Sequence, residues 1–506
     1  MNRCLFLFLF AFTTVTLNAE ILPKNGSILN YRLIGFSVNE EKGASKYTFQ
    51  VAKGNHDNVD SFKKYTILSL PSITGTTTAE VPEFGAEYTW RVLQQGNKKN
   101  DTTFYHFSTL MNDRVDTSKY RLKILQPSEN YKDMFVSLDG GGVFYDFKGK
   151  PVAYIPEVNG LTGFVADMGF TDDSTITFNF GPNGREITLN GDILWKLPDY
   201  NNVNTSGDPD KYHHAFTKLS NGHYMTLGME YIFSKVVSTP DTSYVLLSDS
   251  KSRPEGYSIG YYGTIMEFDK DGKVVWFWKD TKNIIGTDFD YYAAKNPDSV
   301  QRFDPHCNSI FFDEKNGFVY MSYRNLNRII KIDYKTRKIV NVYGENFKPG
   351  APSKGSGYFC NPHGVRRSNK GYIYFFNNNS CKNTDSLPSI VILQEPINDE
   401  DSLKKIWEFN CTVEGDYQKK FGAGGSVIEM LDGSMYVCMG NHYTKMFIVT
   451  RNKKVLWSAL PERHIETDNI WFPVKQYKTN IINRKNFEKL IWMAEKNTVV
   501  TEKSKK

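Results

Sequence analysis

Short runs of alternating hydrophobic and polar residues, separated by turns rich in Asp and Gly, recur from about residue 130 onward. The clearest run, 265–276, contains an apolar strand, the turn 269–272 and a second strand that carries Trp276. Related runs occupy 144–154, 187–195 and 330–341, and two more end in Trp407 and Trp457. Alternation of this kind between turn residues is typical of β-hairpins with one buried face. The chain therefore contains six predicted hairpins.

A further pair of strands precedes most of these hairpins. Residues 308–312 and 318–322, for example, are two apolar segments joined by the turn 313–317. Four strands repeated about six times are the pattern of a β-propeller, in which neighbouring sheets cover each other's faces. No long amphipathic helical pattern interrupts the repeat. We therefore predict an all-β fold, with a six-bladed β-propeller as the catalytic domain over residues 126–500.

The first part of the chain has a different pattern. Segments with strand composition occur at 31–36, 46–51, 87–92 and 103–108, and the third contains the sequence Tyr-x-Trp-x-Val. This strand, the polar turn after it and the aromatic strand that follows resemble the late strands of a fibronectin type III-like sandwich. Residues 20–125 are therefore predicted to form a small N-terminal β-sandwich domain.

The N-terminus has the pattern of an export signal. Arg3 precedes the apolar run 4–12, and Ala19 offers a site for cleavage. This run is too short to cross a bilayer comfortably, so a signal peptide over 1–19 is favoured over a membrane anchor. No later segment is long and apolar enough to span a membrane. We expect an exported protein, periplasmic or secreted, without a membrane span.

Charge and cysteine content refine this expectation. The 506 residues include 62 basic and 56 acidic residues, and the net charge of +6 is spread along the chain. Because nucleic-acid binding needs a concentrated basic surface, no nucleic-acid partner is expected. Beyond the signal, Cys360 and Cys381 flank one strand pattern and are a reasonable disulfide pair in an exported protein. The five cysteines that remain are odd in number, so at least one is left outside a disulfide within the chain.

Three histidine-containing loops precede predicted strand pairs. His214 and His363 each lie eight residues before a turn glycine, and His306 lies eleven before Gly317. In a propeller, residues just before the first strand of each blade face one central channel, so these imidazoles are expected to converge. The register favours His214 for the inward position, but a shift of one residue would exchange it with His213. Both remain candidates.

The residues near these histidines favour an anion over a metal ion. Arg324 adds a planar guanidinium that repels cations and binds anions, and Asn308 adds an amide donor. No Asp or Glu occupies the matched position, and Asp304 is better interpreted as orienting His306. We therefore expect no metal ion and no cofactor. A neutral histidine in such a group can serve as a nucleophile.

At these residues the sequence resembles the bacterial arylsulfate sulfotransferase family. The segment 304–310, Asp-Pro-His-Cys-Asn-Ser-Ile, is similar to that family's His-x-Asn-Ser-Ile unit, and 322–324 to its downstream arginine strand. Residues 362–365, Pro-His-Gly-Val, resemble the loop with the nucleophilic histidine, and 212–214 the first histidine loop. The resemblance covers about 130 to 460. It implies an exported six-bladed propeller with a small N-terminal β domain.

The resemblance also implies an activity and roles for single residues. Family members move a sulfuryl group from a phenolic sulfate ester to a phenolic acceptor through a sulfohistidine, in a ping-pong mechanism without a nucleotide donor. His363 would be the nucleophile, and His306, Arg324 and His214 would hold the sulfuryl oxygens. The substrate-binding candidates are Asn308, His213, Tyr323 and Ser426. Tyr212, Phe303 and Phe359 also flank the expected site, and each either stacks on an aryl ring or belongs to the core.

Other functions are compatible with the same pattern. One alternative is a non-catalytic secreted propeller that binds an anionic glycan or a protein, and another is a histidine-dependent polysaccharide lyase or hydrolase. The partners expected for the favoured function are a small aryl sulfate donor and a phenolic acceptor. The sequence does not fix the oligomeric state, and a homodimer is one arrangement that it allows.

Overall fold

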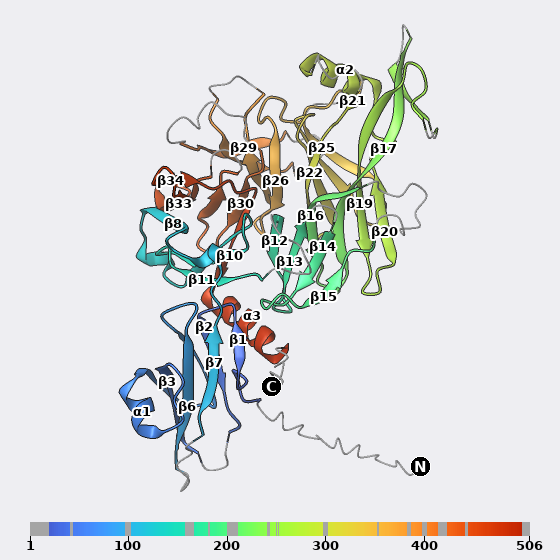
Figure 1. Ribbon diagram of the computed structural model, residues 1–506. Coiled ribbons are helices and arrows are strands. Elements are labelled where there is room, and N and C mark those ends of the chain that lie inside the picture. The colour runs from blue at the N-terminus through green and yellow to red at the C-terminus, as the bar shows by residue number, and fades with distance from the viewer. Residues whose placement is uncertain are drawn as a thin grey trace, which may run out of the picture. The chain divides into compact units, whose positions relative to one another are not determined.

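The structure, a computed structural model, describes residues 20–40, 44–96, 103–156, 166–180, 183–199, 211–239, 243–248, 250, 252–296, 302–351, 354–381, 386–396, 402–412, 423–440 and 444–497. The expected signal peptide, 1–19, lies outside the described residues. The chain divides into two compact units, Met1–Leu110 with Glu495–Lys506, and Met111–Ala494. Both units are built mainly of β-strands, which confirms the predicted all-β class (Figure 1).

The smaller unit contains two sheets. One has the strand order β1 (Ser27–Leu29), β7 (Tyr105–Thr109), β6 (Glu87–Gln95), β3 (Lys46–Lys53) and β4 (Thr66–Ser72). The other pairs β2 (Leu33–Ser37) with β5 (Thr76–Glu80), and α1 (Val59–Lys64) precedes β4. Phe36 of β2 meets Trp90 of β6 and Phe107 of β7 edge to face, with ring centroids 5.4 and 6.2 Å apart. An aromatic core of this kind lies between the two sheets, as a sandwich requires.

The end of this unit lies earlier in the chain than the predicted boundary at residue 125. Strand β8 (Tyr120–Gln126), which the sequence analysis assigned to the N-terminal domain, pairs antiparallel with β33 (Val455–Ile465) of the larger unit. Two 3-10 helices flank β8: η1 (Asp113–Val115) and η2 (Glu129–Tyr131). Strand propensity marks β8 as a strand but carries no information about which distant strand it pairs with.

The larger unit contains six sheets of four to six strands. Sheet 1 consists of β35 (Thr479–Asn483), β9 (Met134–Leu138), β10 (Val143–Asp146) and β11 (Pro151–Tyr154). Sheet 2 consists of β12 (Ala166–Phe170), β13 (Ile176–Phe180), β14 (Asn183–Ile187) and β15 (Ile193–Lys196). Sheet 3 consists of β16 (Lys211–Lys218), β17 (Tyr224–Ser238), β19 (Ser258–Phe268) and β20 (Val274–Lys279), with β18 (Ser243–Ser248) and β21 (Arg302–Phe303) at its margin.

The remaining sheets follow the same order along the chain. Sheet 4 consists of β22 (Cys307–Asp313), β23 (Phe318–Tyr323), β24 (Arg328–Asp333) and β25 (Ile339–Gly344). Sheet 5 consists of β26 (Pro362–Arg367), β27 (Tyr372–Asn377), β28 (Ser389–Gln394) and β29 (Lys404–Asn410). Sheet 6 consists of β30 (Ser426–Glu429), β31 (Met435–Cys438), β32 (Met446–Val449), β33 and β34 (Ile470–Pro473), with β8 alongside β33.

The first strands of the six sheets (β35, β12, β16, β22, β26 and β30) contact one another in a closed series. Each contacts the next in that order, and the Ser426 hydroxyl of β30 donates to the Thr479 carbonyl of β35 over 3.3 Å. The C-terminal strand β35 thus completes the sheet begun by β9, close to the N-terminal end of the same unit. The repeat of hairpins in the sequence ends before this strand, so the local pattern did not predict it.

Tryptophans at the ends of the predicted hairpins join neighbouring sheets. The indole N–H of Trp195 donates to Lys270, and that of Trp276 donates to Tyr334, at 3.0 and 2.8 Å from the carbonyl oxygens. Trp407 reaches Arg451 at 2.8 Å, and Trp457 reaches Phe147 at 3.1 Å. Each acceptor lies in the hairpin turn of the next sheet, and the last bond joins sheet 6 to sheet 1. The recurring aromatic position therefore has a structural cause, since a buried indole needs an acceptor for its N–H.

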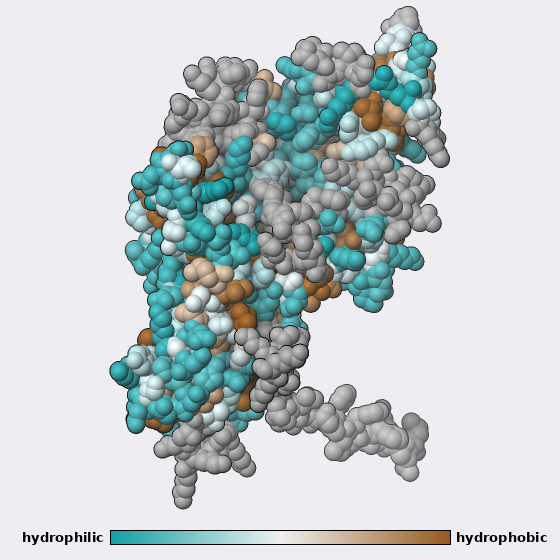
Figure 2. All heavy atoms as spheres, viewed as in Figure 1, coloured by the Kyte–Doolittle hydropathy of each residue, from teal (hydrophilic) through white to brown (hydrophobic). Residues whose placement is uncertain are grey.

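Helices are few in the larger unit. Besides η1 and η2, those in the part of the unit that the structure describes are α2 (Gly286–Lys295), which follows sheet 3, and α3 (Arg484–Asn497), which follows β35. Phe487 of α3 packs on Phe135 and Phe144, with ring centroids 4.7 and 5.3 Å away. The long hairpin of β17 and β18 projects beyond its sheet, and Figure 2 shows hydrophobic residues exposed on it. Among the described residues no helix combines the length and the apolar character needed to cross a bilayer.

The predicted disulfide between Cys360 and Cys381 is present. It joins the residue just before β26 to the segment after β27, so it ties together the two ends of the first hairpin of sheet 5. Cys307, Cys411 and Cys438 are free and buried. The disulfide therefore constrains the loop that leads to His363.

Candidate active site

Two of the first strands, β16 and β22, have distorted backbone near their starts. His214 and His306 have φ angles of 63° and 58°, in the left-handed region that non-glycine residues seldom adopt. The pairing of each first strand with its neighbour shifts register close by, between Tyr212 and Phe216 and between Cys307 and Ser309. Such bulges redirect side chains, and left-handed residues cost about 1–2 kcal/mol each. Strain of this kind at two histidines points to a functional site.

His363 is the second residue of β26 and has both ring nitrogens engaged. Its Nδ1 lies 2.6 Å from the carbonyl oxygen of Gly425, and its Nε2 lies 2.5 Å from the hydroxyl oxygen of Tyr477. A carbonyl can only accept, so Nδ1 carries the proton and donates to Gly425. Nε2 therefore has a free lone pair that accepts from Tyr477. This is the tautomer and direction that a nucleophilic Nε2 requires.

The surroundings keep His363 neutral. Its side chain is almost fully buried, and burial lowers the pKa of His363 well below the usual value. The Lys478 ammonium lowers this pKa further, and His306 and Arg324 act in the same direction, while the hydrogen bond to Gly425 opposes them. At neutral pH the ring is therefore uncharged, with its Nε2 lone pair available.

The imidazoles of His214 and His306 lie next to each other, and that of His214 also lies next to Tyr477. The rings of His214 and His306 meet edge to face with centroids 5.2 Å apart, and His214 lies 5.9 Å from the Tyr477 ring. Burial, followed by the charges of His213 and His306, lowers the pKa of His214 well below the usual value. The Tyr477 ring also lies 5.0 Å from that of His363, so it links the two halves of the group.

His213 lies behind His214. The two Nδ1 atoms are in hydrogen-bonding contact, and the ring centroids are 4.6 Å apart at 84°. His213 is buried, whereas the ring of His214 meets those of His306 and Tyr477. Of the two candidates from the sequence, His214 therefore occupies the position that faces the group, and His213 supports it.

Arg324 lies between the loops of His306 and His363. Its backbone N–H donates to the His306 carbonyl over 3.0 Å, and its own carbonyl accepts from the Asn361 amide over 2.9 Å. The Nε atom is buried and has no hydrogen-bond partner among the described residues. Burial lowers the pKa of Arg324, but a guanidinium remains charged at neutral pH. A buried, fixed and unsatisfied cationic donor is suited to an oxyanion.

Asp304 accompanies His306, as the sequence analysis expected. Its Oδ2 lies 3.6 Å from Nδ1 of His306 and 2.9 Å from a guanidinium nitrogen of Arg302. Burial by itself would raise the pKa of Asp304, but His306 and Arg302 outweigh burial and hold it below its usual value. The carboxylate stays ionised and orients the imidazole.

Tyr477 and Lys478 are site residues that the sequence analysis missed. They directly precede β35, so they occupy in sheet 1 the place that the histidine loops occupy in sheets 3 to 5. Buried Asp139 holds the segment by accepting from both backbone N–H groups, over 3.2 and 2.6 Å. Lys478 pairs with Asp167 of sheet 2 over 2.6 Å. Only the closure of the ring by β35, which the local pattern does not reveal, brings these residues to the site.

Asn308 has a different place from the one predicted. Its amide nitrogen donates to the Pro362 carbonyl over 2.9 Å, and its amide oxygen accepts from the Ser322 hydroxyl over 2.5 Å. The side chain is fully buried, so both ends of the amide serve the protein itself. Asn308 therefore fixes the residue next to His363, and its predicted contact with the sulfuryl group is not what this geometry favours.

The aromatic candidates for ring stacking lie in the core. Tyr323 and Phe303 belong to one buried apolar cluster, Tyr212 to a second and Phe359 to a third. Each has at most 2% of its surface exposed. The abundance of aromatic residues in the chain made these positions indistinguishable from true substrate contacts.

A cavity of about 300 Å³ adjoins the histidine group, and first strands of all six sheets line it. Its wall includes Gly364, next to His363, and Lys478, next to Tyr477. Ser426 also lines the cavity, but its hydroxyl donates to the Thr479 carbonyl. Among the described residues, no three His, Cys, Asp or Glu side chains are grouped as a metal site would need.

Three solved structures are similar to parts of the chain. A protein of unknown function from Bacteroides caccae is 14% identical, covering 69% of this chain and 99% of that one, with a TM-score of 0.37. An auxiliary nutrient binding protein from Bacteroides thetaiotaomicron is 11% identical, covering 92% and 95%, with a TM-score of 0.34. The Cps50 (Swd1) beta-propeller domain from Myceliophteria thermophila is 11% identical, covering 70% and 96%, with a TM-score of 0.34. These scores are too low to carry an argument about fold or activity.

The search for related families gives a clearer result. No curated protein sequence matches the chain. Residues 91–392 match the family described as Arylsulfotransferase (ASST). The match spans more than half of the chain and includes His214, His306, Arg324 and His363. It confirms the resemblance seen in the histidine motifs: the chain belongs to the arylsulfotransferase family.

Proposed function

We propose that this protein is an arylsulfate sulfotransferase that transfers a sulfuryl group through His363 in a ping-pong mechanism. Membership of the family supports sulfuryl transfer from aryl sulfates to phenols in general. The observation that carries the finer proposal is the state of His363, with Nδ1–H directed at Gly425 and an unprotonated Nε2 beside Tyr477. The six sheets with their closed series of first strands are, in this proposal, the blades of a six-bladed propeller.

In the first half-reaction, Nε2 of His363 attacks the sulfur of the aryl sulfate. The N–S bond forms as the bond from sulfur to the aryl oxygen breaks, and the phenolate leaves. The product is an imidazole ring that bears SO₃ on Nε2 and a proton on Nδ1. The positive charge of this ring is stabilised by the Gly425 carbonyl, which accepts from Nδ1–H. The sulfur then occupies the place beside Nε2 where the Tyr477 hydroxyl lies in the free enzyme.

Fixed donors around this place stabilise the charge that develops. Arg324 offers the unsatisfied Nε–H of its guanidinium, and His306 and Tyr477 offer further N–H and O–H donors beside His214 and His363. Donors fixed before the reaction lower the barrier because they need no reorganisation when charge moves to the sulfuryl and aryl oxygens. Burial raises the pKa of Tyr477 well above the usual value, so its hydroxyl is a neutral donor at neutral pH.

The second half-reaction reverses the first with a different phenol. The acceptor oxygen attacks sulfur, the S–N bond breaks, and the proton of the acceptor passes to a nearby base. His214 is suited to this role, because its depressed pKa keeps the imidazole neutral at neutral pH. The proposed reaction needs neither a metal ion nor a cofactor. The proposal includes export, to the periplasm or the medium, after removal of residues 1–19.

Turnover of 4-nitrophenyl sulfate tests the proposal. The protein should release nitrophenol faster when phenol is added, and phenyl sulfate should appear in equal amount. His363→Asn should abolish both products without lowering the midpoint of thermal unfolding by more than a few degrees. Rapid turnover by this variant would contradict the role of His363. Release of nitrophenol with no phenyl sulfate would identify a hydrolase.

A further inference from the structure

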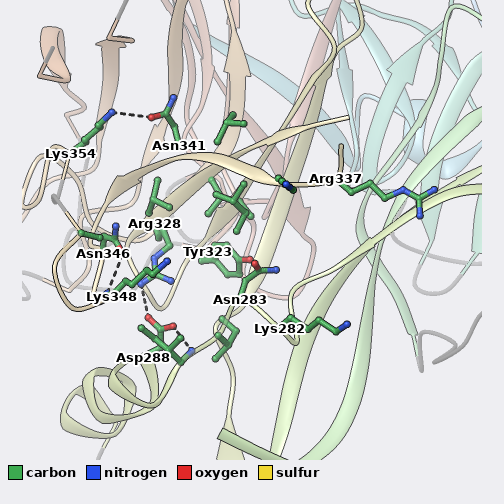
Figure 3. A pocket seen from close by; sticks show the side chains of 18 residues that line it. Lys282, Asn283, Asp288, Tyr323, Arg328, Arg337, Asn341, Asn346, Lys348 and Lys354 are labelled. Atoms are coloured by element: carbon green, nitrogen blue, oxygen red, sulfur yellow. Dashed lines mark hydrogen bonds and ion pairs between the residues drawn. The ribbon is translucent and has the colours of Figure 1, made fainter. Parts of the chain in front are cut away.

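A large cavity on the described part of the chain lies outside the histidine group. It has a volume of about 620 Å³ and lies along β25, against the segment that joins β20 to α2. Figure 3 shows the side chains that line it, with Asp288, Arg328 and Lys348 gathered together. Cavities of this size, about 300–1,000 Å³, are typical of sites for small molecules and short chains.

The lining of this groove is strongly basic. It contains six cationic side chains and a single carboxylate, and the cations are Lys282, Arg328, Arg337, Lys338, Lys348 and Lys354. The carboxylate, Asp288, is buried and forms an ion pair with Arg328 over 2.6 Å. No described carboxylate forms an ion pair with the other five cations. The local excess of positive charge is therefore not neutralised within the protein.

The carboxylates of the nearby residues Glu345 and Asp333 form hydrogen bonds with groups outside the groove lining. Both oxygens of the Glu345 carboxylate are engaged, one by the Ser356 hydroxyl over 2.7 Å and the other by the Gly357 N–H over 3.0 Å. Asp333 accepts from the Thr336 N–H over 2.6 Å. Neither residue lines the groove.

The cations are distributed over the length of a strand. Arg337 and Lys338 precede β25, whereas Lys348 follows it. At about 3.3 Å per residue, the six residues of β25 separate these groups by roughly 20 Å. In Figure 3 Lys348 and Arg328 lie next to Asp288, and Arg337 lies at the opposite side. A single sulfate ion cannot reach both groups of cations, but an elongated ligand with several anionic groups can.

Neutral polar groups lie between the charges. Asn341 occupies the position that holds a tryptophan in the hairpins of sheets 2, 3, 5 and 6, and its amide oxygen accepts from Lys354 over 3.1 Å. Asn283 and Asn346 also line the groove, and Ile339 and Val342 add apolar surface. Tyr323 is the single aromatic side chain among the described lining residues, and it is 1% exposed. Without exposed rings for base stacking, the groove is unsuited to single-stranded nucleic acid.

We propose that this groove is a second anion site, which binds a short, elongated polyanion: an oligosaccharide or polyol with several sulfate, carboxylate or phosphate groups. The charges at the two ends of β25 hold the anionic groups, and the asparagines bind the hydroxyls between them. The site is separate from the histidine group and does not depend on sulfuryl transfer.

Isothermal titration calorimetry tests the proposal with four probes. A heparin-derived hexasaccharide carries sulfates and carboxylates, a hyaluronan hexasaccharide carries carboxylates alone, and inositol hexakisphosphate carries phosphates. Sodium sulfate is the reference with a single anionic group. At least one polyanion should bind, more weakly at high salt, and the ranking of the three identifies the preferred group. Saturation by sodium sulfate with the same affinity would overturn the requirement for several anionic groups, and so would no binding of any polyanion.

The matched variants are Lys338→Glu combined with Lys348→Glu, and Lys148→Glu with Lys150→Glu as the control. The control lysines lie in or beside the exposed turn between β10 and β11, away from the groove. The groove variant should bind the polyanion at least about tenfold more weakly, whereas the control should bind it like the unchanged protein. Equal weakening in both variants would overturn the site. Turnover of 4-nitrophenyl sulfate should be the same in both, so failure of this proposal is distinguishable from failure of the proposed function.

Discussion

The Nε2 atom of His363 lies 2.5 Å from the hydroxyl oxygen of Tyr477, a residue 114 positions later in the chain. Because Nδ1 of the same ring donates to Gly425, the Tyr477 hydroxyl must be the donor in this contact. The bond holds the imidazole in place and marks where a sulfur atom would bind. Tyr477 is in turn affected by Arg324. The guanidinium charge lowers the pKa of Tyr477, whereas burial has the larger effect and raises it.

Removal of this hydroxyl should impair transfer. Tyr477→Phe keeps the ring but loses the O–H group, and we expect the rate of nitrophenol release to fall about 100-fold, as when one fixed donor is removed from an oxyanion site. Tyr436→Phe is the matched control, because its hydroxyl bonds to Thr479 nearby over 2.7 Å but contacts no described histidine. Equal rates for both variants would exclude a catalytic contribution of Tyr477.

The acid limb of the pH–rate profile, where the rate falls at low pH, should reflect protonation of His363. Its pKa is lowered by burial and then by Lys478, so the ring stays neutral at pH 6.5, the ordinary midpoint for histidine. The rate of the donor half-reaction should therefore be maximal at this pH and fall only in more acidic solution. The free energy of unfolding should also fall as the pH drops below 6.5. In that range the unfolded chain gains protons at His214 and His363 before the folded chain does.

Replacement of Lys478 should shift the pH at which the rate falls on the acid side. Lys478→Met removes a positive charge that disfavours the imidazolium, so the pKa of His363 should rise and the acid limb should shift to higher pH. Lys475→Met is the control, since Lys475 is exposed three residues earlier. Rates of nitrophenol release, read at the isosbestic wavelength of nitrophenol, give the profile. A shift of equal size in both variants would show that Lys478 has no specific effect.

Gly364 should be intolerant of a side chain. It has a φ angle of 66°, and an added Cβ would lie 3.2 Å from the carbonyl oxygen of Gly425, the acceptor for His363. Gly364→Ala should cost about 1–2 kcal/mol of stability and lower the turnover more than tenfold. Gly317→Ala is the control: it has a similar φ of 71° and open space around the Cβ, so it should lose stability but not activity. Thermal unfolding and turnover of both variants separate the two effects.

Asn308 should act by positioning His363. Asn308→Ala removes the donor to the buried Pro362 carbonyl and leaves the Ser322 hydroxyl with Ser309 alone, which should cost about 1–3 kcal/mol of stability. We expect kcat to fall with little change in KM for the donor, because the nucleophile is less well fixed. Ile332→Val, a buried change in the same sheet that costs about 1 kcal/mol, should leave kcat unchanged. A rise in KM alone would indicate direct contact of Asn308 with the substrate.

Much of this architecture can be predicted from short segments of the sequence. The hairpins could be predicted because a repeated sheet needs alternating residues, turn glycines and an aromatic side chain that reaches the next sheet, as Trp276 does. His214, His306 and His363 could be predicted as a group because each lies near the start of a first strand. These features depend on residues close together in the sequence.

The remainder depends on contacts between distant segments. Tyr477 and Lys478 reach the site because β35 pairs with β9, and nothing within residues 470–490 specifies that partner. For the same reason the predicted boundary at residue 125 falls at the end of β8, whose pairing with β33 is equally remote. Tyr323 was misjudged for another reason: in a chain with 30 tyrosines, burial in the core and exposure at a site give the same local pattern.

The most direct test of the central claim is the mass of the intact protein after exposure to 4-nitrophenyl sulfate without an acceptor. We predict a gain equal to one SO₃ group, located on His363 by peptide mapping and lost when phenol is added. His363→Asn should show no gain. Turnover without any adduct, or an adduct that persists in His363→Asn, would contradict transfer through this histidine.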